Sequence, residues 1–198
     1  LVGDVTRSDD VDSWISRTEE ELGPIDLLVA NAGISTDEDA AWEVEPADWW
    51  HVFEVNVLGV YLCCRAVIPG MLERGAGRIV NVASGAAYLP GSKSTAYSAS
   101  KAALSSFFES LRIDLSGTGV DVTIIHPGFI KTPLTAGRKA KLPFLLELDE
   151  AVAKIVWAIE KRKKSYAFPW QLASVVRATM LMPNSMYDWF AGRNSLRE

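Results

Sequence analysis

The sequence predicts an α/β fold with a doubly wound, mostly parallel sheet in three layers, α/β/α. Three short apolar runs, at 25–30, 78–83 and 121–126, lack the polar alternation of half-exposed strands, so we expect them to be buried on both faces. Longer segments with helical spacing separate these runs, which is the pattern of right-handed βαβ units. The chain has 198 residues, of which 48% are hydrophobic and 23% charged, and this composition fits one globular domain over 1–198.

The first expected helix covers about 8–22, with Ser8 as its N-cap and Gly23-Pro24 as its end. The segment before it, 1–5, is expected to be a strand leaving the sheet. Because Leu1 is no natural start, we expect further residues upstream of it.

Three more helices are expected, at about 46–74, 95–115 and 149–162, where apolar residues recur at helical spacing. The run 165–169 is expected to be a last short strand, because Pro169 closes it. Large apolar residues dominate the remaining segment, 170–198, which is expected to be a helical C-terminal extension with helices at 170–182 and 186–190.

Charge and composition exclude several classes of protein. The formal charge of −5 gives no broad electrostatic reason to bind nucleic acid, and the basic run 161–164 is expected to be a solvated helix end. The neighbouring Cys63 and Cys64 lie in an apolar helical pattern, which indicates core residues rather than a disulfide framework or a metal site. No apolar run approaches the roughly 20 residues of a spanning helix, and no signal peptide opens the chain, so a cytoplasmic protein is expected.

A tyrosine and a lysine, Tyr97 and Lys101, stand at i and i+4 in the segment YSASK, where one helix face carries both. A positive charge beside a phenol favours the phenolate, so Tyr97 can exchange a proton with an alcohol or a carbonyl at neutral pH. Ser84 ends a buried strand, where its hydroxyl can hold the same oxygen. The alternative for the pair is an ordinary surface tyrosine and lysine. His51 and His126 are expected to have structural roles.

These motifs, in this order and spacing, resemble the classical branch of the short-chain dehydrogenase/reductase family from residue 1 to about residue 169. The resemblance implies a Rossmann-like fold that begins here at the family's third strand. Further family motifs match Asp4-Val5, Asn31-Ala32-Gly33, Asn56, Pro127-Gly128 and Thr132.

The resemblance also implies hydride transfer between a nicotinamide cofactor and an alcohol or ketone. Tyr97 is then the general acid/base and Ser84 holds the substrate oxygen. Lys101 lowers the pKa of Tyr97 and binds the nicotinamide ribose, and Asn56 positions a water that relays protons to Lys101. The alternative for Asn56 is a buried amide satisfied by the backbone.

For the cofactor, the resemblance implies that Thr132 binds the nicotinamide carboxamide and that Asp4 and Val5 lie near the adenine. Gly33 and Gly128 are expected to let a nucleotide approach the backbone, and ordinary turn glycines are the alternative. The full expected set is Asp4, Val5, Asn31, Ala32, Gly33, Tyr97, Lys101, Pro127, Gly128 and Thr132.

The family's phosphate-binding T-G-x-x-x-G-x-G turn does not occur in the sequence, so two leading βα units are expected to be missing. The residues that select between NAD and NADP lie in these missing units, so the sequence does not decide which of the two cofactors is used.

The segment 133–148 corresponds to the region that lies over the substrate in this family, and its leucines imply an apolar alcohol or ketone; the alternative is that they pack a short helix. The extension 170–198 is expected to pack within the molecule, with a neighbouring subunit or a bilayer surface as alternatives. A homodimer or homotetramer is implied by the resemblance. The rival hypothesis for the function is a non-catalytic module that serves only structure or oligomer formation.

Overall fold

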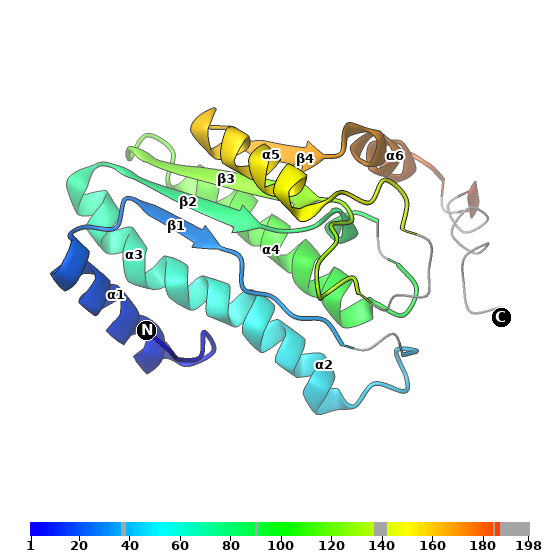
Figure 1. Cartoon of the computed structure of the whole chain (residues 1–198), viewed down its shortest axis with the longest axis horizontal. Helices are drawn as coiled ribbons and strands as arrows, with labels where there is room; N and C mark the ends of the chain where they lie inside the picture. Colours follow the sequence, from blue (N-terminus) through cyan, green and yellow to red (C-terminus); the bar gives the residue numbers. More distant parts are fainter. Residues whose placement is uncertain (37–38, 90, 137–141, 184, 187–198) are drawn as a thin grey trace.

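The computed structural model describes residues 1–36, 39–89, 91–136, 142–183 and 185–186. Four strands form one parallel sheet in the order β1-β2-β3-β4, as the sequence predicts (Figure 1). The strands are β1 (Leu27–Ala30), β2 (Gly77–Val82), β3 (Val120–Pro127) and β4 (Ser165–Phe168). The helices are α1 (Ser8–Leu22), α2 (Pro46–Phe53), α3 (Val60–Arg74), α4 (Thr95–Asp114), α5 (Leu148–Glu160) and α6 (Trp170–Met180). A π-helical segment, η1 (Glu54–Gly59), and a 3-10 turn, η2 (Gly85–Ala87), complete the described elements.

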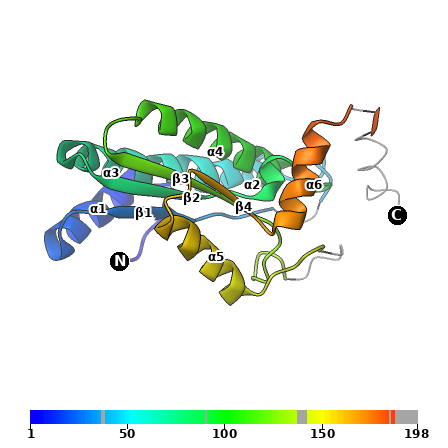
Figure 2. The same ribbon diagram turned by 90° about the horizontal axis from the view of Figure 1, so that it is seen from above.

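The three predicted layers are present, and they follow from the alternation of side chains along the strands. Ile79 and Ile124 pack with buried residues of α3 and α4 on one face of the sheet. Val80 and Ile125 point to the opposite face and pack with α5. Figure 2 shows α4 and α5 on opposite sides of the strands. The central strands are therefore buried on both faces, as expected for β2 and β3.

The first strand differs from the prediction that all three apolar runs are buried on both faces. Leu27 is 45% exposed and Val29 is 44% exposed. Among the described residues β1 pairs only with β2, so it is an edge strand. Val29 is paired with Val80 and lies on the same face of the sheet, where α5 packs against β3, so the side chains of β1 on this face reach solvent. The apolar pattern identifies the strand and does not reveal its place in the sheet.

The prediction of a strand at 1–5 is wrong. A strand requires a hydrogen-bonded partner, and no described strand pairs with this segment. It forms a local turn instead, in which the Asp4 carboxylate accepts hydrogen bonds from the backbone and the hydroxyl of Thr6, each at 2.9 Å. Arg7, and not Ser8, is the N-cap of α1, so the expected serine cap is absent as well.

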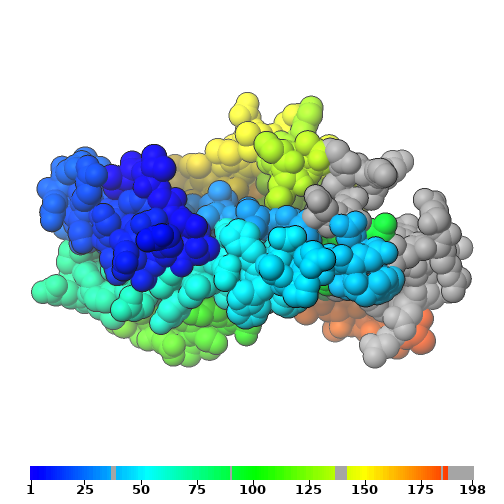
Figure 3. Space-filling model, turned by 90° about the horizontal axis from the view of Figure 1, so that it is seen from below, coloured from blue at the N-terminus to red at the C-terminus, as the bar shows by residue number. Residues whose placement is uncertain are grey.

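The helical segment 46–74 runs through α2, η1 and α3 and packs beside α1 on one face of the molecule (Figure 3). By length and composition it qualifies as a membrane-spanning helix, which corrects the expectation that no segment approaches that length. Its few polar residues interrupt the apolar runs but leave the helix apolar as a whole. The same segment contacts β1, β2 and α4, so within this fold it acts as a core helix.

The C-terminal elements lie where the sequence places them. The helices α5 and α6 and the strand β4 match the expected segments to within a few residues, and the basic run 161–164 is exposed just after α5. Cys64 is buried and Cys63 half-buried, and both are free thiols. The helix expected at 186–190 lies outside the described residues except for Met186.

Candidate active site

Helix α4 brings Tyr97 and Lys101 onto one face, as their i, i+4 spacing requires. The Lys101 ammonium lies 5.6 Å from the centroid of the Tyr97 ring. Lys101 is only 4% exposed, and its Nζ donates a hydrogen bond to the backbone oxygen of Val82 at 3.2 Å. Since Val82 ends β2, this bond fixes the lysine head at the carboxyl end of the sheet, where doubly wound folds bind ligands.

Burial controls the charge of Lys101. Removal from water lowers the pKa of Lys101 to about 8, because it penalises the charged ammonium. In the part of the chain that the structure describes, no carboxylate forms an ion pair with it. The amine is therefore protonated at pH 7 and still has donors to offer to an acceptor that enters the site.

This burial makes a prediction about stability. Between about pH 8 and pH 10.5 the unfolded chain binds one more proton at Lys101 than the folded chain, so stability contributed by this residue rises with pH across that window. From pH 7 to pH 10.5, we expect the wild type to gain about 3 kcal/mol in free energy of unfolding relative to Lys101→Met. Urea unfolding of both proteins at the two pH values, without nucleotide, measures this gain. A constant difference would contradict the burial of a charged Lys101.

Ser84 lies two residues beyond the end of β2 and caps the η2 turn. Its Oγ accepts a hydrogen bond from the backbone N–H of Ala86 at 3.1 Å. This bond orients the oxygen, and no described residue accepts the hydroxyl hydrogen. Helix α4 packs against η2, so the element that carries Tyr97 contacts the turn that carries Ser84.

Asn56 is fully buried in the π-helical segment η1 and joins three parts of the chain. Its Oδ1 accepts from the backbone N–H of Ile34 at 2.8 Å, and its Nδ2 donates to the backbone oxygen of Ile34 at 3.0 Å. Nδ2 also donates to Ser100 Oγ at 2.9 Å, and that hydroxyl donates to the backbone oxygen of Tyr97 at 2.8 Å. Most of the hydrogen-bonding groups of this amide are thus bonded within the protein, mainly to the backbone, as the alternative interpretation of Asn56 expects. One lone pair of Oδ1 is left to accept a hydrogen bond from a water.

Gly33 lies in the exposed loop after β1, immediately before the residue that Asn56 holds. A Cβ at Gly33 would lie 3.3 Å from Lys101 Nζ and 3.4 Å from Asn56 Oδ1. A side chain at Gly33 would therefore crowd the buried lysine and asparagine, so glycine lets the loop lie close to both. Asn31 and Ala32 precede Gly33 in the same loop and are exposed. The structure thus brings the N-A-G loop, Asn56 and Lys101 together.

At Gly128 the missing side chain has a different explanation. A Cβ there would lie 2.6 Å from Leu172 and 3.0 Å from Pro169, so the packing of α6 requires the glycine. Pro127 is buried at the end of β3. Thr132 begins a short turn in which its N–H donates to Thr135 Oγ at 3.0 Å.

Asp4 and Val5 lie near the site only through Val5, which contacts the segment that carries Asn56. A Cβ at Gly59 would lie 2.8 Å from the Val5 side chain, which places Val5 against the end of η1, the segment that carries Asn56. The two hydrogen bonds from Thr6 hold the pKa of the exposed Asp4 carboxyl below its usual range.

Sequence reasoning missed the role of Ser100, whereas it expected a structural role for His126. Ser100 links Asn56 to α4, and its place inside the YSASK segment was a usable signal. His126 is buried, its Nε2 lies 3.3 Å from Ser105 Oγ, and its ring centroid lies 4.9 Å from that of Tyr88. Burial lowers the pKa of His126 to about 4, so it is neutral at pH 7. Among the described residues, no three His, Cys, Asp or Glu side chains converge as metal ligands.

A parallel three-layer α/β sheet with a buried lysine at the carboxyl end of β2 is a doubly wound α/β fold, which binds its ligands at that edge of the sheet. The chain belongs to the short chain dehydrogenase family, whose sequence model matches residues 1–143.

Two relatives illustrate the similarity. An uncharacterized oxidoreductase of Myxococcus xanthus is 42% identical over 193 residues, which are 96% of this chain and 75% of that protein. The 2-(R)-hydroxypropyl-CoM dehydrogenase of Xanthobacter autotrophicus is 41% identical over 68% of this chain and 55% of that protein. The chain therefore spans only about half the length of some of its curated relatives.

Solved structures have the same fold. The 3-ketoacyl-(acyl-carrier-protein) reductase of Brucella melitensis, solved with NADH, superposes with a TM-score of 0.75 at 29% identity over 84% of this chain and 74% of that chain. A short-chain dehydrogenase of Streptomyces avermitilis gives a TM-score of 0.78 at 25% identity over 94% of this chain and 75% of that chain.

Proposed function

We propose that the protein is an NAD- or NADP-dependent oxidoreductase that interconverts an alcohol and a ketone. The observation that carries the proposal is the position of Lys101. Its buried ammonium lies 5.6 Å from the Tyr97 ring centroid and 3.3 Å from the vacant Cβ position of Gly33. One cation thus connects the proton-transfer residue to the loop that is expected to meet the cofactor.

Each proposed role uses a property of the residue concerned. Tyr97 exchanges a proton with the substrate oxygen, and the neighbouring positive charge of Lys101 favours the phenolate. Ser84 donates its hydroxyl hydrogen to the same oxygen, while the Ala86 N–H donates to one lone pair of its Oγ and orients it. Asn56 fixes the loop after β1 and can accept one hydrogen bond from a water that leads toward Lys101.

The residues of this chain fit the nicotinamide end of the cofactor. The exposed backbone at Gly33, which has no side chain and lies beside a buried ammonium with no carboxylate partner among the described residues, suits a ribose with its hydroxyl oxygens. Asn31, Gly33, Lys101 and Thr132 are the residues that would hold this end. When bound, the nicotinamide supplies or accepts the hydride. The NADH in the Brucella reductase structure supports the same cofactor class.

The substrate and the assembly follow from the same family. The substrate segment 133–148 presents Phe144 and Leu145 at the surface, about half exposed, which suits a lid over an apolar substrate. Tyr61 and Phe107 make an edge contact between α3 and α4, and these helices are the proposed contact surface of a homodimer or homotetramer.

A spectrophotometric assay tests the proposed function. We expect the full-length protein, with the phosphate-binding segment expected upstream of residue 1, to oxidise NADH or NADPH when an apolar ketone is added, and to reduce NAD or NADP when the matching alcohol is added. The 198-residue chain alone should bind the nucleotide negligibly, because it lacks that segment. A Ser84→Ala variant, which loses the oxygen-holding hydroxyl, should lower turnover tenfold or more, on the order of one lost transition-state hydrogen bond. If a broad set of ketones and alcohols gives no nucleotide-dependent change, the non-catalytic alternative is correct.

A further inference from the structure

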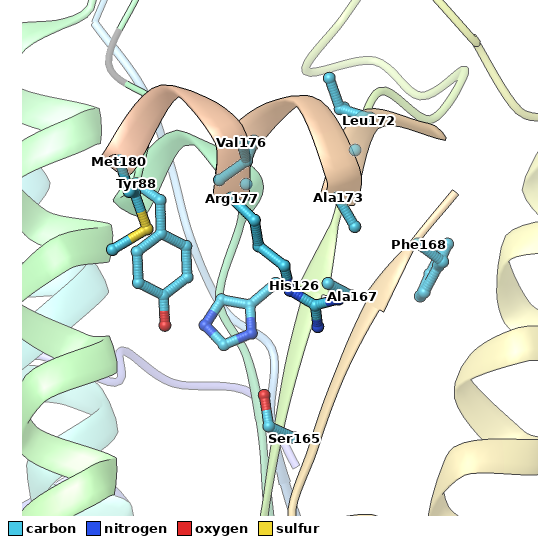
Figure 4. Close-up of a pocket in the computed structure, with 12 residues that line it drawn as sticks. Tyr88, His126, Ser165, Ala167, Phe168, Leu172, Ala173, Val176, Arg177 and Met180 are labelled. Atoms are coloured by element: carbon cyan, nitrogen blue, oxygen red, sulfur yellow. The ribbon is translucent and has the colours of Figure 1, made fainter. Parts of the chain in front are cut away.

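A cavity of about 250 Å³ lies between α6, the ends of β3 and β4, and the η2 turn (Figure 4). Two of its lining residues, Gly85 and Gly128, directly follow Ser84 and Pro127, which belong to the candidate active site. The cavity therefore lies next to two chain segments of the candidate site, although neither Ser84 nor Tyr97 is among the described residues that line it. Its volume exceeds the roughly 150 Å³ of a cavity that holds benzene, so it has room for one ring with a small polar group.

Apolar side chains form most of the wall. Leu172, Val176 and Met180 line the cavity from α6, and Phe168 lines it from β4. Such a surface gains free energy by taking up an apolar part of a ligand. The helix α6 belongs to the C-terminal extension. Its side chains pack within the molecule and also form part of the cavity wall.

Of the described residues in the lining, only Arg177 has a permanently charged side chain. Figure 4 shows its side chain extending from α6 toward the strands. Arg177 makes no hydrogen bond or ion pair with any described residue, and none of the described residues that line the cavity is a carboxylate. The buried His126 is neutral at pH 7, since burial lowers its pKa to about 4. Glu109, whose charge acts on His126 and Tyr88, is already ion-paired with Arg112.

We propose that this cavity binds the acidic end of the substrate, a carboxylate held by Arg177 on an apolar ring or chain that packs against α6. A guanidinium beside an apolar wall is suited to this ligand, because it pairs with a carboxylate through two parallel hydrogen bonds. The inference rests on the proposed function and narrows it: the substrate is a keto acid or hydroxy acid with an apolar body.

Phenylacetate and its neutral analogue phenylacetamide test the cavity without requiring turnover. By calorimetry, we expect phenylacetate to bind the wild type and Arg177→Met to weaken this binding about tenfold or more, the range of one charge-assisted interaction. Phenylacetamide should bind both proteins equally. Lys161→Met removes one charge from the exposed end of α5 and should leave both ligands unaffected.

Two more measurements complete the test. Met180 is 60% exposed at the cavity, so Met180→Trp should narrow the cavity and weaken both ligands without unfolding the protein. In the ketone assay, phenylacetate should compete with the substrate in the wild type. Absence of phenylacetate binding, equal binding by wild type and Arg177→Met, or binding without competition overturns the inference.

The two proposals fail in different ways. If Arg177→Met leaves phenylacetate binding unchanged while the protein still reduces ketones, the cavity assignment is wrong and the proposed function stands. If phenylacetate binds in an Arg177-dependent manner but no ketone is ever reduced, the proposed function is wrong, and with it the assignment of the bound anion as substrate.

Discussion

Replacing Tyr97 by phenylalanine is expected to lower kcat for ketone reduction by about two to four orders of magnitude, the usual contribution of a positioned acid or base. The substitution removes only the hydroxyl group. The ring should therefore stay beside Lys101, whose ammonium lies 5.6 Å from the ring centroid in the wild type. Steady-state rates with varied ketone and varied nucleotide measure the effect. Because Tyr97 is expected to act on the reacting oxygen, the KM for the nucleotide should change little.

A matched control separates chemistry from packing. Tyr61 lies on α3 and is 46% exposed, with its ring against Phe107 on α4. Tyr61→Phe also removes one phenolic hydroxyl and should leave kcat unchanged. If Tyr97→Phe retains turnover within a few-fold of the wild type, Tyr97 is not the acid/base, and a role for it in packing is then favoured.

Local signals predicted most of the fold. The bounds of α1 and α4 follow from spacing and turn residues that lie within a few positions of each helix end, so the sequence alone places them. The segment 1–5 has the composition of a strand, but a strand depends on a partner elsewhere in the chain. The same dependence explains why Leu27 is exposed in β1.

In the candidate site, too, the sequence predicts the features that depend on neighbouring residues and not those that depend on distant partners. The i, i+4 spacing of Tyr97 and Lys101 determines that they share a helix face, and this geometry is local. The partners of Asn56 are separated from it by 22 and 44 residues, and nothing in the sequence around Asn56 indicates that its amide is bound to Ile34 and Ser100. The π-helical turn at η1, which aims this side chain inward, likewise has no sequence signature we can identify.

Two buried asparagines allow a direct comparison, because the amide of one is hydrogen-bonded and the amide of the other has no partner among the described residues. Asn56 and Asn81 are both 0% exposed. Asn56 makes three hydrogen bonds, to both backbone groups of Ile34 and to Ser100. The amide nitrogen and oxygen of Asn81, on β2, have no hydrogen-bond partner among the described residues. The two residues therefore differ in the bonds that their amides make and not in exposure.

We expect Asn56→Leu to lower the free energy of unfolding by about 3 to 5 kcal/mol, because it leaves the half-buried N–H and C=O of Ile34 without their partner and removes the donor to the Ser100 oxygen. Asn81→Leu keeps a branched side chain with the same number of heavy atoms and removes an amide that has no partner among the described residues, so it should be neutral or stabilising by about 1 kcal/mol. Urea unfolding of the two variants beside the wild type measures both values. Equal losses in the two variants would mean that size at these positions, and not the hydrogen bonds of Asn56, determines stability.

Because those bonds also hold the loop beside Gly33, Asn56→Leu should weaken nucleotide binding more than Asn81→Leu does, even at temperatures where both variants remain folded.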